Sequence, residues 1–306
     1  MNNIASSIFR RFPKAYDAYV YFLSKMFKFS PHARRGYGIK VMDESWDYLI
    51  VLDACRFDSF KACNKIKGKL KKKISRADHT MLWLKKNFSI HYADTIYVSA
   101  NPFVSDIEFK GFQASKYFFK VYPVWDCAWD KETATVHPRE VVATALKARD
   151  EFPDKRMIIH FIQPHAPFIG KTKISSKELG IDENVPKDET IQKIWQQVRA
   201  GKIEIDKLKR AYIDNLNLVL AEVESLIEHL DGKIVITADH GECFGEWGIF
   251  GHPGGTYVKP LIEIPWLVIQ KDRKQTKIRA QAKETEFSQV SESEVCEKLK
   301  ALGYLE

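Results

Sequence analysis

Two adjacent residues of this chain, Asp239 and His240, are of types that bind metal ions, and they follow a strongly apolar run. Residues 234–238 (Ile-Val-Ile-Thr-Ala) are too few and too apolar for an amphipathic surface helix and are typical of a buried strand. A carboxylate and an imidazole would then lie at the carboxyl end of a strand, where open α/β sheets bind ligands. An Asp-His pair is common by chance, so its meaning depends on partners elsewhere in the chain.

Other strand patterns deliver polar side chains to their carboxyl ends in the same way. They are residues 46–53, which end in Asp53, residues 94–99, which lead to Asn101, and residues 157–163, which lead to His165. Because the carboxyl ends of parallel strands meet at one edge of a sheet, we expect these side chains to converge with Asp239 and His240.

Helix patterns alternate with the strand patterns along the chain, and this alternation predicts the fold class. The helix patterns cover residues 138–152, 206–230 and 291–303, the last with a capping box at Ser291 and Glu294. A closing strand is predicted over residues 261–269, where Pro265 indicates a sheet edge or a bulge. We therefore predict an α/β fold, a three-layer αβα sandwich with a largely parallel central sheet.

Asp53, Asp239 and His240 form a hard, mixed oxygen and nitrogen ligand set, which suits a divalent cation such as Mn²⁺, Mg²⁺ or Zn²⁺. Such a set needs a fourth ligand. Thr80 stands at a turn that enters a predicted helix, where backbone N–H groups can hold a phosphoryl group. Taken alone, a threonine there is more often a helix N-cap. If it binds the metal, its hydroxyl loses its proton more easily and becomes a nucleophile.

Taken in order, these residues resemble the alkaline phosphatase superfamily. The motifs are Leu-Asp53-Ala-Cys-Arg56-Phe-Asp58, Thr80 in a Ser/His-rich turn before Trp83, Asn101, Pro-His165-Ala-Pro, and Asp239-His240-Gly-Glu followed by Gly-His252. The closest branch holds sulfatase-like proteins, phosphonate monoester hydrolases and phosphoglycerol transferases. The resemblance runs from about residue 46 to residue 270, and the Leu-Gly-Tyr ending is also typical of sulfatase-like chains.

The resemblance implies a set of site residues and a reaction. It implies that one divalent metal ion (Mn, Zn, Mg or Ca) is bound by Asp53, Thr80, Asp239 and His240. Thr80 would be the nucleophile, Asn101, His165 and His252 would bind the substrate, and the two histidines would also take part in catalysis. The implied enzyme is a metal-dependent hydrolase or phosphotransferase of phosphate mono- or diesters, which works through a covalent phospho-threonine.

Departures from the family pattern narrow this expectation. The Cys-x-Pro-x-Arg context of type I sulfatases is absent, so Thr80 indicates phosphate rather than sulfate esters, and Cys55 is interpreted as structural. Many sulfatases carry a second acidic ligand where this chain has Ala54. Gln163 stands where the family pattern has an aspartate of the second zinc site of alkaline phosphatases, so we expect one metal. His160, within a strand, is interpreted as a core histidine with satisfied hydrogen bonds.

The composition indicates which kind of substrate the protein binds and in which compartment it is expected. The 306 residues carry a net charge of +8, which indicates a small anionic ester, lipid-headgroup or glycan-phosphate substrate. No nucleic-acid motif is present, and no G-x-G-x-x-G follows the first strand, so we expect neither nucleic acid nor a dinucleotide. Five cysteines without a C-x-x-C pair, no apolar run of about 18 residues and no signal-peptide pattern predict a cytoplasmic protein.

Three segments stand outside the predicted site. We expect an N-terminal amphipathic helical segment over residues 1–40 and a catalytic domain over residues 41–306. Basic and aromatic side chains in residues 3–28 fit peripheral contact with the cytoplasmic face of a membrane, although packing on the domain itself is favoured. The lysines of residues 65–73 predict a solvated loop or edge strand, or else a rim that collects anions. Residues 170–205 read as a polar surface excursion beside the site.

Two alternatives stay open at this point. One is a sulfatase, which would hydrolyse sulfuric esters at the same edge of the sheet. The other is a non-catalytic protein that binds anionic glycans or lipid headgroups through residues 65–73 and the N-terminal helices. Loss of a metal ligand would favour the second, and none is lost. The sequence does not indicate an oligomeric state.

Overall fold

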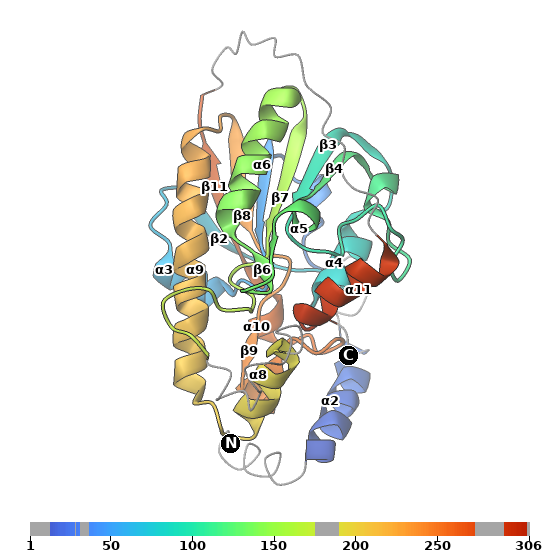
Figure 1. Ribbon diagram of the computed structural model, residues 1–306, viewed down its shortest axis with the longest axis vertical. Helices are drawn as coiled ribbons and strands as arrows, with labels where there is room; N and C mark the ends of the chain where they lie inside the picture. The colour runs from blue at the N-terminus through green and yellow to red at the C-terminus, as the bar shows by residue number, and fades with distance from the viewer. Residues whose placement is uncertain (1–12, 28, 31–36, 175–189, 273–290, 305–306) are drawn as a thin grey trace.

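A seven-stranded sheet with the order β2-β11-β8-β1-β7-β3-β4 forms the centre of the protein (Figure 1). The structure is a computed structural model that describes residues 13–27, 29–30, 37–174, 190–272 and 291–304. The strands are Tyr48–Leu52 (β1), Lys69–Ile74 (β2), Tyr92–Ser99 (β3), Phe118–Pro123 (β4), Arg156–Phe161 (β7), Lys233–Thr237 (β8) and Glu263–Gln270 (β11). The neighbours from β8 to β4 pair in parallel, and β11 pairs antiparallel with β8 and β2.

Strand β1 is buried along its whole length, because both of its faces are covered. Its register places Ile50 beside Ile159 of β7 and Ile236 of β8. Three apolar strands aligned in this way bring their carboxyl ends to the same level. The residues that follow them must therefore meet at one edge.

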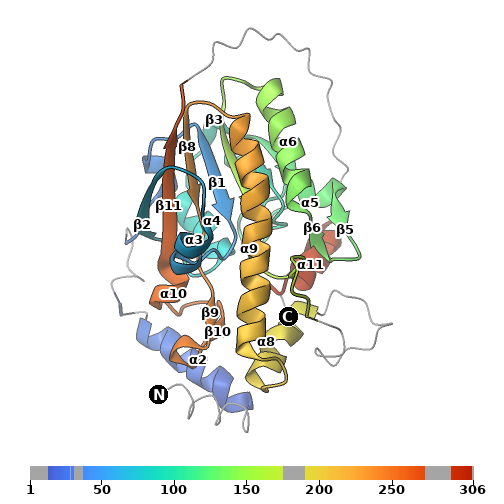
Figure 2. The ribbon, with the colours of Figure 1, turned by 90° about the vertical axis from the view of Figure 1, so that its left-hand side faces the viewer.

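Helices cover both faces of this sheet. Figure 2 shows α6 (Pro138–Glu151) and α9 (Ile205–Glu228) side by side on one face. On the other face, Trp83 of α4 (Thr80–Asn87) packs its ring 6.0 Å from that of His160. The predicted three-layer αβα sandwich with a largely parallel sheet is confirmed.

Shorter elements surround these layers. They are the helices α2 (Pro13–Phe27), α3 (Phe57–Cys63), α5 (Val124–Cys127), α8 (Thr190–Arg199), α10 (Lys259–Ile262) and α11 (Glu292–Ala301), the short strands β5 (Trp129–Asp130), β6 (Thr135–Val136), β9 (Cys243–Phe244) and β10 (Phe250–Gly251), and 3-10 turns at Val41–Asp43, Ala114–Lys116 and Glu246–Gly248. Helix α11 begins with the predicted capping box of Ser291 and Glu294.

Two local expectations need correction. Pro265 does not lie in an edge strand, because β11 is flanked by β2 and β8. The pairing of β11 with β8 ends at Trp266, which follows Pro265 in the chain and is opposite Thr237, the last residue of β8. Proline has no backbone N–H to donate, and Pro265 therefore stands where the hydrogen-bond ladder between β11 and β8 has already ended. Residues 170–205 are not all surface excursion: they contain α8, which buries Ile194 and Val198 at helical spacing.

The lysine run lies where it was predicted, and an ion pair closes the loop after β1. Lysines 69, 71, 72 and 73 lie in β2, which is an edge strand of the sheet. Arg56 binds Asp58 through two hydrogen bonds, of 2.9 Å (Nε to Oδ1) and 2.6 Å (Nη2 to Oδ2). All five cysteines are free thiols, and Cys55 is fully buried.

Helix α2 packs against β10 and the loop that precedes it. Tyr16 and Leu23 are buried, and the hydroxyl of Tyr16 donates to the carbonyl of Phe250 over 3.2 Å. The favoured packing on the domain itself therefore holds for this helix, although Tyr21 and Phe22 are exposed on it. The earlier part of the expected segment lies outside the described residues, and the boundary at residue 40 stays a prediction.

Candidate functional site

Asp53 and Asp239 lie together at the carboxyl edge of the sheet, because they follow the adjacent parallel strands β1 and β8. Neither side chain has any exposed surface. Asp239 accepts hydrogen bonds at Oδ1 from the backbone N–H groups of Ala54 (3.1 Å) and His240 (2.8 Å). The other oxygen of this carboxylate, Oδ2, and Oδ1 of Asp53 have no hydrogen-bond partner. Each carboxylate thus keeps one oxygen for another ligand.

His240 faces both of these unpartnered oxygens. Its Nε2 lies 3.5 Å from Asp53 Oδ1 and 3.4 Å from Asp239 Oδ2. Its Nδ1 lies 2.8 Å from the carbonyl oxygen of Gly241, which fits an N–H donated there and a free lone pair on Nε2. Gly241 allows this turn, since a Cβ there would overlap the carbonyl oxygen of Pro260.

Thr80 completes the group, with its Oγ1 3.3 Å from His240 Nε2. The turn before it is tied to the edge of the sheet, because the hydroxyl of Ser75 donates to the backbone oxygen of Asp239. Asp78, which is fully buried, accepts the backbone N–H of Thr256 over 2.8 Å. The structure thus brings together Asp53, Thr80, Asp239 and His240 from three separate segments.

The electrostatics of this group fit a divalent cation. Burial, and then the charge of Asp239, raise the pKa of Asp53 well above its usual range. Burial, and then the nearby His252, lower the pKa of His240, so its imidazole is neutral. Two buried carboxylate oxygens without partners, a neutral imidazole nitrogen and a hydroxyl suit a hard or borderline cation. That these residues bind a metal stays a prediction.

His160 is not the satisfied core histidine that we predicted. Its Nδ1 is bonded to the hydroxyl of Tyr97 over 2.9 Å, but its Nε2 has no partner. That nitrogen lies 3.9 Å from Oδ2 of both Asp53 and Asp239, and the ligand atoms of the three residues lie within 4.8 Å of one another. Burial lowers the pKa of His160 to about 4, which leaves it neutral and able to bind a cation.

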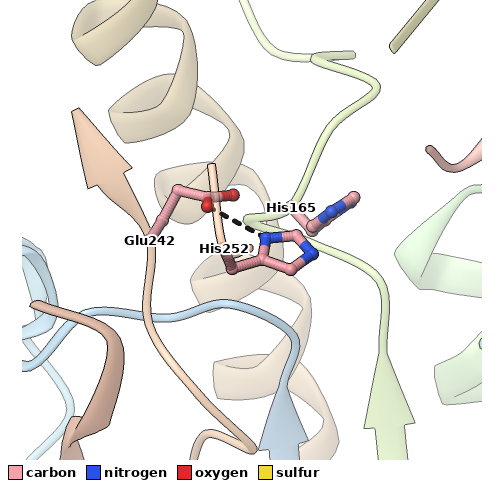
Figure 3. Close-up of side chains that lie close together, drawn as sticks. All are labelled: His165, Glu242 and His252. Carbon is pink, nitrogen blue, oxygen red and sulfur yellow. Dashed lines mark hydrogen bonds and ion pairs between the residues drawn. The ribbon is translucent and has the colours of Figure 1, made fainter. Parts of the chain in front are cut away.

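His165 and His252 meet beside this group, as Figure 3 shows together with Glu242. Their ring centroids are 5.1 Å apart, and that of His252 is 4.6 Å from that of His240. Glu242 Oε1 lies 2.9 Å from His252 Nδ1. Burial lowers the pKa of His165. Burial acts in the same direction on His252, but the nearby carboxylates, Glu242 foremost, together outweigh it and raise the pKa of His252. A neutral and a more basic imidazole therefore face the same space.

Asn215 of α9 holds the loop that carries His165. Its Nδ2 donates to the carbonyl oxygens of His165 (3.0 Å) and Pro167 (3.1 Å), and its Oδ1 accepts the N–H of Ile169 (2.9 Å). The side chain is fully buried. A polar residue on the buried side of this helix was the one signal in the sequence for such a role.

Asn101 lies at the site, but its amide is bonded to protein atoms. Nδ2 donates to Asp53 Oδ2 over 2.8 Å and to the hydroxyl of Tyr304 over 3.1 Å. Oδ1 accepts the N–H of Phe103 over 3.0 Å. Its predicted role in substrate binding stays a prediction, while its contact with Asp53 is a feature of the structure.

Comparison with known proteins gives similarity of fold. No protein-family model and no curated protein sequence matches the chain. One similar structure is the C-terminal periplasmic domain of phosphoethanolamine transferase EptC from Campylobacter jejuni, at 15% identity over 72% of this chain and 78% of that one, with a TM-score of 0.46. A 2-O GAG sulfatase is 11% identical over 78% of this chain and 66% of that one, with a TM-score of 0.45.

A longer protein is also similar. It is the integral membrane lipooligosaccharide phosphoethanolamine transferase A from Neisseria meningitidis, at 13% identity and a TM-score of 0.49. The match covers 75% of this chain but 48% of that protein. These similar proteins are transferases and sulfatases, which are classes that the sequence motifs also resemble, and the likeness is one of fold.

The predicted cytoplasmic location is wrong by the same comparison, since a matched domain is periplasmic. The prediction rested on missing signals in the sequence, and such absences do not identify a compartment. Within the described residues, no helix combines the length and the apolar character that a membrane span requires.

Proposed function

We propose that this protein transfers the phosphoryl group, or a substituted phosphoryl group, of an anionic ester to water or to an acceptor alcohol. Thr80 is the nucleophile, and a divalent metal ion is held by Asp53, Asp239 and His240 together with the Thr80 hydroxyl. One observation carries the proposal: the two unpartnered carboxylate oxygens face His240 Nε2, beside the buried hydroxyl of Thr80.

The metal and the protein divide the chemistry. When bound, a divalent cation lowers the pKa of a coordinated hydroxyl and offsets charge on the phosphoryl oxygens. His160 Nε2, which also faces the two carboxylates, is a further candidate ligand. The first turn of α4, which begins at Thr80, adds backbone N–H groups beside the nucleophile.

The reaction is a double displacement. Thr80 reacts as its alkoxide, after its hydroxyl proton has been released to solvent: the oxygen attacks phosphorus and forms a new P–O bond, while the bond to the leaving-group oxygen breaks. His252, whose pKa is raised by Glu242, gives its proton to the departing oxygen. Water or an acceptor alcohol then attacks the phospho-threonine, loses its own proton to neutral His252, and the Thr80 oxygen leaves. The substrate ester is cleaved and the enzyme is restored.

The substrate class follows from charge and from the nucleophile. A net charge of +8 favours anionic esters, and lipid headgroups and glycan phosphates share that chemistry. A threonine in place of the sulfatase cysteine motif favours phosphorus over sulfur at the reacting centre. The similar structures include phosphoethanolamine transferases, which is consistent with a headgroup phosphodiester as the donor.

An assay of the purified protein tests the proposal. The protein is stripped with EDTA, then incubated with Mn²⁺, Zn²⁺, Mg²⁺ or Ca²⁺ and an aryl phosphate monoester, an aryl phosphodiester or an aryl sulfate. We expect turnover of a phosphate ester that needs added metal. Sulfate as the best substrate would replace the proposal by a sulfatase. Binding of anionic lipids or glycans without turnover of any ester would support a non-catalytic protein.

The pH dependence of turnover tests the role of His252. Because its pKa is raised, the imidazole is protonated below that pKa, and kcat/KM for an ester that needs a proton donor should fall as pH rises through it. Glu242→Gln removes the carboxylate 2.9 Å from Nδ1, so the fall should begin at lower pH. An aryl ester with a very acidic phenol needs no proton and is the control. An unchanged profile in the variant would contradict the assignment.

We also propose that the exposed side of α2 contacts an anionic membrane surface. Tyr21, Phe22 and Met26 are 61%, 59% and 55% exposed, and the exposed Lys25 lies among them. Trp247, 66% exposed, lies beside this helix, since its carbonyl accepts the hydroxyl of Tyr19 over 2.7 Å. Aromatic and basic side chains together are typical of interfacial helices.

Vesicle binding measures this contact. With vesicles of phosphatidylglycerol and phosphatidylcholine, Phe22→Glu should lower the partition coefficient about ten-fold, because one large apolar side chain leaves the interface. Ile90→Glu changes a side chain that is 63% exposed in the loop between α4 and β3, and it serves as the control. Equal binding of wild type and Phe22→Glu would show that α2 does not carry the contact.

A further inference from the structure

Tyr304, near the carboxyl terminus, reaches the same carboxylate that begins the candidate site. Its hydroxyl donates to Asp53 Oδ2, 251 residues earlier in the chain, and accepts from Asn101 Nδ2 over 3.1 Å. Its ring stacks on that of His165, with centroids 5.0 Å apart and planes 18° apart. It also packs 5.0 Å from the ring of Phe103.

The position of Tyr304 is fixed by the end of α11. Its N–H donates to the carbonyl of Leu299 over 2.9 Å, and the N–H of Gly303 donates to that of Lys300 over 2.8 Å. Gly303 has a φ of +74°, so the chain leaves the helix through a left-handed residue, as in many helix C-caps. Leu299 and Leu302 are fully buried and anchor this turn.

These bonds decide which oxygen of Asp53 is free. Oδ2 accepts from both Asn101 and Tyr304, whereas Oδ1 has no partner and lies 3.5 Å from His240 Nε2. A carboxylate whose second oxygen is held by two donors cannot rotate about its Cβ–Cγ bond without breaking both. Hydrogen bonds of this kind orient metal ligands and raise metal affinity.

We infer that Tyr304 is a positioning residue, which together with Asn101 orients Asp53 so that Oδ1 binds the metal ion. The inference rests on the proposed function, because it needs a metal at this site. The C-terminal turn is thereby part of the active site. The ring of Tyr304, which stacks on that of His165, also forms one wall of the space into which the substrate ester enters.

Direct metal binding tests the inference. EDTA-stripped wild type, Tyr304→Phe and Tyr122→Phe are titrated with Zn²⁺ and with Mn²⁺ in a calorimeter. Tyr304→Phe keeps the ring but loses the hydroxyl, so we expect metal affinity to fall about 10- to 100-fold. Tyr122 donates to Glu151 over 2.5 Å in another part of the fold, and its loss should leave metal affinity unchanged.

Each outcome decides a different question. Wild type that binds neither cation would refute the proposed function, and the inference with it. Wild type and Tyr304→Phe with equal affinity would refute only the inference. A gain in kcat/KM at unchanged metal affinity would also refute it, because Tyr304 would then be an obstacle to the substrate. Recovery of the activity of Tyr304→Phe at high metal concentration, with the melting temperature of the stripped form close to wild type, would support it.

Discussion

Thr80→Ala is expected to lower kcat for a phosphate ester about a thousand-fold or more at saturating metal, because the variant has no nucleophile at this position. The hydroxyl is fully buried and lies 3.3 Å from His240 Nε2. Initial rates with an aryl phosphate, at several metal concentrations, measure the effect. The fold should survive, because the N-cap of α4 is His79, and Thr80 is not the cap that a lone threonine at such a turn often provides.

Thr80→Ser is the matched control for this prediction. It keeps the hydroxyl and loses one methyl group, so a substantial part of the wild-type rate should remain. If Thr80→Ala instead retained the wild-type rate, the ester would be attacked directly by water, and the covalent phospho-threonine would be excluded. Mass spectrometry of the acid-quenched wild-type reaction should find the phosphoryl group on Thr80 during turnover.

Most of the site residues that the sequence identified follow an apolar strand. Asp53 follows β1 and Asp239 follows β8, so the strand pattern alone placed both at the carboxyl edge. The order of the family motifs added Thr80, at the start of α4, and His252, in a loop, and no strand pattern marks either position. For these residues, the residue type and the position beside a strand, a helix or another motif were enough to predict that they belong to the site.

The residues that it missed depend on register and on the path of the chain. His160 lies within β7, and it reaches Asp53 because it is opposite Val51 on β1, a pairing that composition does not determine. Tyr304 depends on where α11 docks, although the Leu-Gly-Tyr ending marked it as a family feature. Asn215 is a polar residue on the buried side of α9, and its partners are carbonyl groups of a distant loop. Only the tertiary structure supplies such partners.

Asp53→Asn is expected to change the stability of the protein in opposite directions with and without metal. In EDTA at neutral pH, the variant should be more stable than wild type, by about 1–3 kcal/mol. Burial, and then the charge of Asp239, raise the pKa of Asp53 in the folded state. A raised carboxyl pKa means that the stability due to this group is present below its unfolded pKa and is lost as pH rises through the folded pKa. The amide carries no charge and avoids this loss.

The local hydrogen bonds also favour the amide in the metal-free protein. Its oxygen can accept from Tyr304 and Asn101, as Oδ2 does in wild type. Its NH₂ group then replaces Oδ1, which has no hydrogen-bond partner and lies 3.5 Å from His240 Nε2. Asp58→Asn is the control, since Asp58 is paired with Arg56 and has a lowered pKa, so the same substitution there should not stabilise the protein.

With metal added, the order should reverse. The free energy of unfolding of wild type should rise with the logarithm of the ratio of metal concentration to Kd. Asp53→Asn has lost a charged ligand, so its free energy of unfolding should rise little. Urea unfolding in EDTA and in excess Zn²⁺ or Mn²⁺ measures both effects on the same samples. A variant that is less stable than wild type in EDTA would mean that the buried carboxylates do not repel each other. A variant that is stabilised by metal as much as wild type would remove Asp53 from the site. The proposed centre requires both halves of the result, because the repulsion that weakens the metal-free fold is what makes the pair bind a cation.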